Sequence, residues 1–136
     1  MRRIRVGIGV LAVAAVMACD DDGVELDFEA FDAELIGANE VPPVETDAEG
    51  RATFDWDGTR VLYEIVATAP IEGVVAAHIH DGEAGVNGPI LVTLFTGAAV
   101  DLEAEESLTE GNFTAPDDGV ELTIEELLDL MRSQDV

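Results

Sequence analysis

The sequence predicts an all-β domain, an antiparallel immunoglobulin-like sandwich or barrel with one short C-terminal helix. Apolar and polar residues alternate over short segments, and turn signals separate these segments at short intervals. A helix-start signal follows near the C-terminus. Short strands at this spacing favour antiparallel sheets over an alternation of strands and helices.

Residues 1–18 have the pattern of a bacterial lipoprotein signal peptide. Three arginines lie within the first five positions, and residues 6–16 form an apolar run. This run is shorter than the roughly 20 residues of a membrane-spanning helix, which favours a cleaved signal. Residues 16–19, Val-Met-Ala-Cys, resemble the lipobox whose cysteine is lipidated. An ordinary signal peptide with an incidental cysteine is the alternative.

Cys19 is the single cysteine of the chain, so it cannot form an internal disulfide. Its position favours lipidation, which predicts an extracytoplasmic lipoprotein anchored to a membrane of the cell envelope, in the periplasm or at the cell surface. Residues 19–29 are predicted to be an acidic tether. Residues 30–136 are predicted to form the β-domain.

The charge of the chain after cleavage excludes some partners. Residues 19–136 hold three arginines and no lysine against 30 acidic residues, a formal charge of −27. A surface this acidic repels nucleic acid, so we expect no nucleic-acid partner. Repulsion among the acids also predicts that stability rises with salt.

The first three strands follow from alternation and turn signals. Phe31, Ala33 and Leu35 alternate with acidic residues and predict a half-buried strand. Residues 51–55 and 60–68 flank an Asp-Gly hairpin signal and predict two paired strands. The apolar side chains expected in the core include Phe54, Trp56, Leu62, Ile65 and Phe95.

A strand ending in His78-Ile79-His80 comes next, and its two histidines should share one face because side chains alternate along a strand. Gly82, Gly85 and Gly88 predict an irregular loop before the apolar run 90–95.

The last element is predicted to be a helix. Thr123-Ile124-Glu125-Glu126 is a capping box, in which the threonine and the second glutamate satisfy each other's backbone N–H groups. Four apolar residues then recur at helical spacing and predict one buried face: Ile124, Leu127, Leu128 and Met131.

Two segments resemble the CHRD domain, a module named after chordin and found in many secreted bacterial proteins. They are Ala33 to Val44 and Ala76 to Pro89. The resemblance implies an extracytoplasmic setting and two motif loops, with the residues Asn39, Glu40, Pro42, Pro43, Gly82, Gly85, Asn87, Gly88 and Pro89. CHRD domains generally continue into a final pair of strands, and their motifs are missing here. We expect the C-terminal part of the domain to be lacking, through a truncated reading frame or in a divergent short member, and a sheet edge to be open.

His78 and His80 permit two interpretations. Two imidazoles on one strand face form a copper or zinc half-site, which needs a further ligand from Asp81, Glu83 or another acid. The alternative is that both rings brace the glycine-rich loop by hydrogen bonds to carbonyls, and Asn87 is then a turn residue. We expect the bracing role and no resident cofactor.

Catalysis has little support, because neither serine of the chain lies in a nucleophile motif and no glycine-rich loop has phosphate-binding spacing. The sequence therefore predicts a lipid-anchored, noncatalytic binding or structural domain of the cell envelope. Its expected partner is an envelope protein or a surface polymer. The alternative function is copper or zinc binding through the histidine strand.

Overall fold

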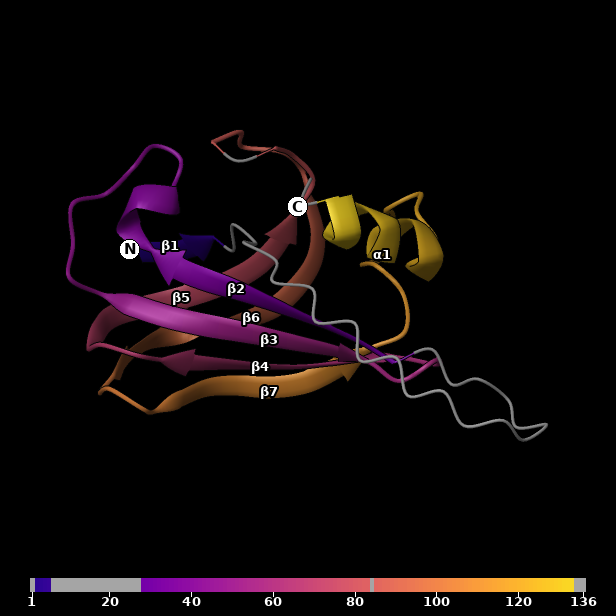
Figure 1. The fold of residues 1–136 in the computed structure, drawn as a ribbon. Coiled ribbons are helices and arrows are strands. Elements are labelled where there is room, and N and C mark those ends of the chain that lie inside the picture. The colour runs from indigo at the N-terminus through magenta and orange to yellow at the C-terminus, as the bar shows by residue number, and fades with distance from the viewer. Residues whose placement is uncertain (1, 6–27, 84, 134–136) are drawn as a thin grey trace.

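The computed structural model describes residues 2–5, 28–83 and 85–133 (Figure 1). The apolar run 6–16, Cys19 and most of the predicted tether lie outside these residues. In chain order the elements are β1 (Arg2–Arg5), β2 (Glu29–Ile36), a 3-10 helix η1 (Gly37–Asn39), β3 (Glu49–Trp56), β4 (Val61–Ala67), β5 (Ile71–His80), β6 (Ile90–Leu102), β7 (Ser107–Phe113) and α1 (Ile124–Ser133).

Two sheets make up the fold, as predicted. One has the strand order β2-β3-β4-β7 and is antiparallel throughout, and the other has the order β1-β5-β6. In the second sheet β5 and β6 are antiparallel, whereas β1 runs parallel to β5. The four-stranded sheet lies across β5 and β6 in Figure 1, with α1 at one end. The open strand order makes the domain a sandwich and not a barrel.

Alternation along the strands builds one apolar core between the sheets. On β2 the predicted inward residues Phe31, Ala33 and Leu35 are all buried, and the acids between them face outward. The other sheet contributes residues such as Val74 and Ile79, each with no exposed surface. Burial of apolar area at about 25 cal/mol per Å² makes this core the main favourable term in folding.

The residues predicted to lie in the core differ in how far they are buried. Phe54 and Ile65 are buried, and Trp56 and Phe95 are partly buried against the core. Leu62 is a wrong prediction, because its side chain is 38% exposed. It occupies an outward position of β4, where its neighbours at positions 61 and 63 turn toward the interior.

The β3–β4 hairpin forms at the predicted Asp-Gly signal. Gly58 has a φ of +88°, which glycine adopts without strain. The Asp57 carboxylate accepts hydrogen bonds from the backbone N–H groups of Thr59 and Arg60, both at 3.0 Å. These bonds and the Arg60 guanidinium lower the pKa of Asp57. The turn aligns Trp56 with Val61 at the start of the ladder.

One side-chain hydrogen bond joins the two sheets through the interior. The Tyr63 hydroxyl on β4 donates to the carbonyl oxygen of Leu94 on β6 at 2.9 Å. The Tyr63 ring lies against Gly111 of β7, where a Cβ atom would come within 2.9 Å of a ring carbon. A side chain at position 111 would therefore displace the ring that links the sheets.

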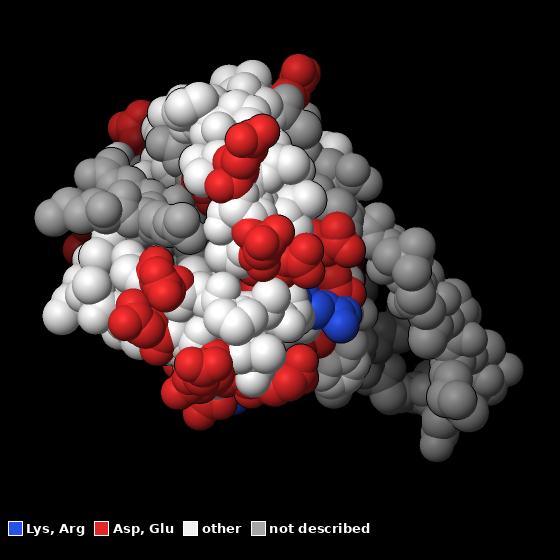
Figure 2. All heavy atoms as spheres, turned by 90° about the vertical axis from the view of Figure 1, so that its left-hand side faces the viewer, with Lys and Arg blue, Asp and Glu red and all other residues white. Residues whose placement is uncertain are grey.

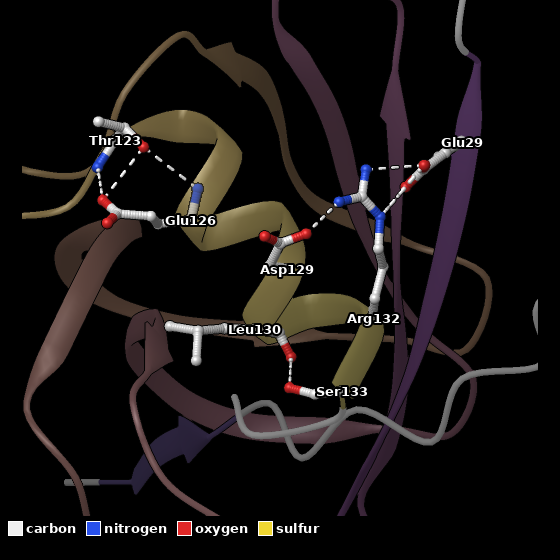
Figure 3. Close-up of polar contacts among 7 residues, drawn as sticks. All are labelled: Glu29, Thr123, Glu126, Asp129, Leu130, Arg132 and Ser133. Atoms are coloured by element: carbon white, nitrogen blue, oxygen red, sulfur yellow. Dashed lines mark hydrogen bonds and ion pairs between the residues drawn. The ribbon is translucent and has the colours of Figure 1, made fainter.

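Helix α1 begins at the predicted capping box (Figure 3). The Thr123 N–H donates to the Glu126 carboxylate at 2.8 Å, and the Glu126 N–H donates to Thr123 Oγ1 at 3.2 Å. Leu127, Leu128 and Met131 are buried in the shared core. The helix therefore closes one end of the sandwich with its apolar face.

Arg132 ties this helix to the first strand of the four-stranded sheet (Figure 3). Its guanidinium donates to both carboxylate oxygens of Glu29, with distances of 2.9 Å from Nε and 2.7 Å from Nη2. It also donates to Asp129 on its own helix. The hydrogen bonds with Glu29 are the main cause of a raised pKa at Arg132.

Three strands differ from the prediction. β7 was not expected, because its sequence Ser-Leu-Thr-Glu-Gly-Asn-Phe is mostly polar and lies on a largely exposed edge. β6 runs to Leu102, well past the predicted apolar run, because residues 96–99 are exposed and their glycine and alanines give little strand signal. β1 lies inside the predicted signal peptide, where no strand was expected. Its pairing with β5 does not test whether that peptide is cleaved. Within the described residues, no helix is long and apolar enough to cross a membrane.

Candidate functional site

His78 and His80 lie near the end of β5 on the face turned away from the core. Both are half-buried, whereas Ala77 and Ile79 between and before them have no exposed surface. The two imidazole rings are neighbours, with their centroids 5.6 Å apart and their planes nearly perpendicular at 82°.

His80 braces the loop that follows it. Its Nδ1 lies 2.9 Å from the carbonyl oxygen of Gly88, so this nitrogen is the donor. The backbone N–H of Asp81 donates to the carbonyl of Pro89 at 2.9 Å and closes the base of the loop. These two bonds join the two arms of the loop at the end of the strand pair β5–β6.

Gly88 is the position where this loop admits no side chain. A Cβ atom there would lie 1.2 Å from the carbonyl oxygen of Asp81, inside the opposite arm of the loop. Gly85 is required for another reason, since its φ of +84° disfavours other residues. The glycine spacing thus reflects the tight course of the backbone.

The outer surface of the loop is partly apolar. Val86 is 57% exposed and Ile90 is 41% exposed, and Asn87 and Pro89 between them are exposed too. Residue 90 was expected only to begin an apolar run, and no role was predicted for Val86. The glycines on both sides of Val86 could have indicated its exposure, because a glycine-rich loop lies on the surface and exposes its side chains.

The second motif loop follows β2. Its base is held by the carbonyl of Gly37, which accepts from the N–H groups of Glu40 at 3.2 Å and Val44 at 2.8 Å. Asn39 donates through its side chain to the Glu34 carbonyl at 3.5 Å, and Pro42 and Pro43 are exposed.

Each motif loop follows the C-terminal end of its strand, and β2 and β5 run in opposite directions in Figure 1, so the two loops leave the sheets at different ends. The structure assembles each loop internally: Asn39, Glu40, Pro42 and Pro43 in one, and Gly82, Gly85, Asn87, Gly88 and Pro89 in the other. The hydrogen bonds above tie each loop to itself and its own strand. We therefore treat the loops as separate elements.

His78 and His80 are the two candidate metal ligands that the structure brings together. Among residues 28–83 and 85–133, no group of three or more His, Cys, Asp or Glu side chains is arranged to hold a metal ion. The bond from Nδ1 of His80 to a backbone carbonyl leaves Nε2 as the nitrogen with a free lone pair in the neutral ring. Metal-ligating histidines are commonly oriented in this way.

The positive charges of the sandwich are all engaged. Each arginine within residues 28–133 forms an ion pair: Arg51 with Asp32, Arg60 with Asp57, and Arg132 with Glu29. Figure 2 shows acidic side chains spread over one face of the molecule, with very little basic surface among them. The surface field of the sandwich is therefore negative and widely distributed.

The protein is a two-sheet β-sandwich domain, and a histidine braces its glycine-rich loop. The family model described as CHRD domain matches residues 31–134, which include both motif loops and helix α1. The chain belongs to the CHRD domain family. Comparisons with curated proteins and with solved structures found no match.

The dispersed negative charge predicts that the midpoint of thermal unfolding rises with sodium chloride. Screening weakens repulsion among the acids, and the Debye length falls from about 10 Å at 0.1 M to about 3 Å at 1 M. Thermal unfolding followed by circular dichroism from 0.05 to 1 M salt measures this. A midpoint that does not change over that range contradicts the prediction.

The close approach at Gly88 predicts a large cost for Gly88→Ala. We expect a loss of about 3 kcal/mol or more in the free energy of unfolding, because the clash is with backbone and cannot be relieved by a rotamer change. Gly97→Ala is the matched control, since a Cβ there meets only the Phe95 ring at an ordinary 3.4 Å. Urea unfolding of both variants checks this, and equal stabilities would refute the account of the loop.

Proposed function

We propose that this protein is a lipid-anchored, extracytoplasmic, noncatalytic binding domain of the cell envelope. The observation that carries the proposal is the glycine-rich loop braced by His80, which exposes Val86 and, where the chain enters β6, Ile90. Exposed apolar side chains on a fixed loop are suited to contact another macromolecule. The partner is an envelope protein or a surface polymer.

The proposal that the domain is noncatalytic rests on the hydrogen bonds of its serine and histidine side chains. Ser107 and Ser133 donate their hydroxyl hydrogens to backbone carbonyls, of Ile65 at 3.5 Å and of Leu130 at 2.9 Å. His80 is engaged by the Gly88 carbonyl. These contacts support structural roles for the groups that most often serve as nucleophile and base.

The extracytoplasmic part rests on the sequence before the sandwich. A basic start, an apolar run and a cysteine at position 19 follow the order of a lipoprotein signal. Family membership supports the same setting, because the resemblance to CHRD domains implies secretion. The acidic residues after Cys19 then form a solvated connection between the lipid and the first strand.

A second candidate function is copper or zinc binding by His78 and His80. The adjacent rings and the orientation of His80 favour it. A third ligand would come from an acid such as Asp81 or Glu83, or from a partner molecule. Imidazole nitrogens suit both metals.

Expression in a bacterium with lipoprotein processing tests the anchor. We expect the wild-type protein to partition into the detergent phase, with an intact mass showing a lipid-modified Cys19 at the new N-terminus. Cys19→Ser should block lipidation and leave the protein in the aqueous phase or unprocessed. Recovery of wild-type protein without lipid, cleaved at another position, would rule out the anchor.

The double variant His78→Ala with His80→Ala separates the two candidate functions. We expect it to lower the free energy of unfolding by about 1 to 3 kcal/mol through lost hydrogen bonds. Copper or zinc should then act equally on the wild type and the variant. A ligand that binds only the folded state raises its melting temperature, so a metal-induced rise confined to the wild type would establish the metal site instead.

Calcium is the control in this comparison. Carboxylates bind it readily and imidazoles do not, so calcium should shift both proteins alike. Titration of the single variants His78→Ala and His80→Ala then shows whether any copper or zinc effect needs both rings.

A further inference from the structure

The outer edge of β5 is paired with a strand that the proposed processing removes. In the described part of the chain, β5 lies between β6 and β1. The backbone register aligns Arg2 with Val74 and Arg5 with His78, in parallel direction. β1 belongs to residues 1–18, so cleavage before Cys19 takes it away.

The other outer edge of this sheet is covered near the start of β6 by the segment around Asp117. The backbone N–H of Asp117 donates to the carbonyl of Leu91 on β6 at 2.8 Å. The Asp117 carboxylate accepts from the N–H of Thr93 at 2.8 Å and from its hydroxyl at 2.6 Å. This side of β6 thus keeps its partners after cleavage, whereas β5 loses β1.

We propose that the β5 edge, once free of β1, binds an extended basic strand of a partner protein in the envelope. This inference rests on the proposed cleavage of residues 1–18. Backbone N–H and C=O groups at an open sheet edge need partners, and an added strand supplies them along its whole length. Strand addition of this kind is a general mode of peptide recognition.

Charge selects a basic occupant over a second copy of the chain. The segment seated on β5 has the sequence Arg-Arg-Ile-Arg, and the processed chain has a formal charge of −27. All three of its arginines are ion-paired within the sandwich, so no basic side chain of the sandwich is left to attract another copy. Two such edges repel each other, whereas a basic strand is attracted.

The direction of β1 links the edge to the proposed binding loop. A strand parallel to β5 runs toward His80, where β5 ends and the loop 81–89 begins. The aligned part of β5 stops at His78, two residues before that point. A partner strand bound in the same direction therefore leads its following residues toward the loop that follows His80, in which Val86 is exposed.

A synthetic peptide with the sequence of residues 1–7 tests the proposal on the processed, full-length lipoprotein in detergent. We expect saturable binding by fluorescence anisotropy. A peptide with Ile4→Pro should bind at least tenfold more weakly because proline removes a donor and resists the ladder. A peptide with glutamate at its three arginine positions should lose at least as much through repulsion.

Amide hydrogen exchange locates the bound peptide on the protein. Exchange in residues 74–78 should slow at least tenfold on addition of the peptide, while residues 52–54 of the central strand β3 should not change. The unprocessed Cys19→Ser protein is the matched control, because its own β1 competes for the edge. It should bind the peptide at least tenfold more weakly than the processed protein.

Intact mass separates failure of this inference from failure of the anchor. A processed protein that binds none of the peptide, binds all three peptides equally, or forms dimers protected in residues 74–78 overturns the inference and leaves the anchor standing. A protein cleaved without lipid that still binds the basic peptide supports the edge and contradicts the anchor. A leader retained in the wild type overturns both.

Discussion

The fold depends on burying the apolar faces of strands β2 to β6 against the repulsion of 30 acidic side chains. Alternation makes this possible, because it turns the acids of β2 outward while Phe31, Ala33 and Leu35 enter the core. No polar or charged residue is buried among residues 28–83 and 85–133. The interior is therefore free of unpaired charge, and the electrostatic cost is confined to the surface, where solvent and salt screen it.

Two of the three arginines of the sandwich lie where separate elements meet. Arg132 joins the closing helix to the first residue of β2, and Arg60 supports the β3–β4 turn through Asp57. Isolated surface ion pairs contribute little, typically about 0 to 1 kcal/mol. The two-pronged contact with Glu29 adds geometry as well as energy, because it fixes the helix against a strand far away in sequence.

Local signals in the sequence predicted the parts of the fold that depend on local chemistry. The Asp-Gly hairpin, the capping box at Thr123 and the alternating first strand all formed as expected. β7 escaped prediction because its strand character comes from pairing with β4 and not from its own polar sequence. Leu62 was misplaced because an apolar residue gives no sign of the register that turns it outward. At the loop, the glycines indicated an irregular backbone and the histidines a bracing role. The structure identified the partners: Gly88 packs onto Asp81, and His80 donates to the Gly88 carbonyl.

Acidity also settles how this sandwich can expose a sheet edge without self-association. Open edges pair with other edges, and proteins commonly block them with charge or cover them with other segments. Here the start of β6 is covered by the segment around Asp117, while β5 is paired with a strand rich in arginine. The negative field makes pairing between two copies costly and pairing with a basic strand favourable. The acidity of the chain therefore both protects the β5 edge and selects the strand that binds it. The braced loop at the end of β5 then adds side-chain contacts to an interaction that the backbone alone would leave unselective.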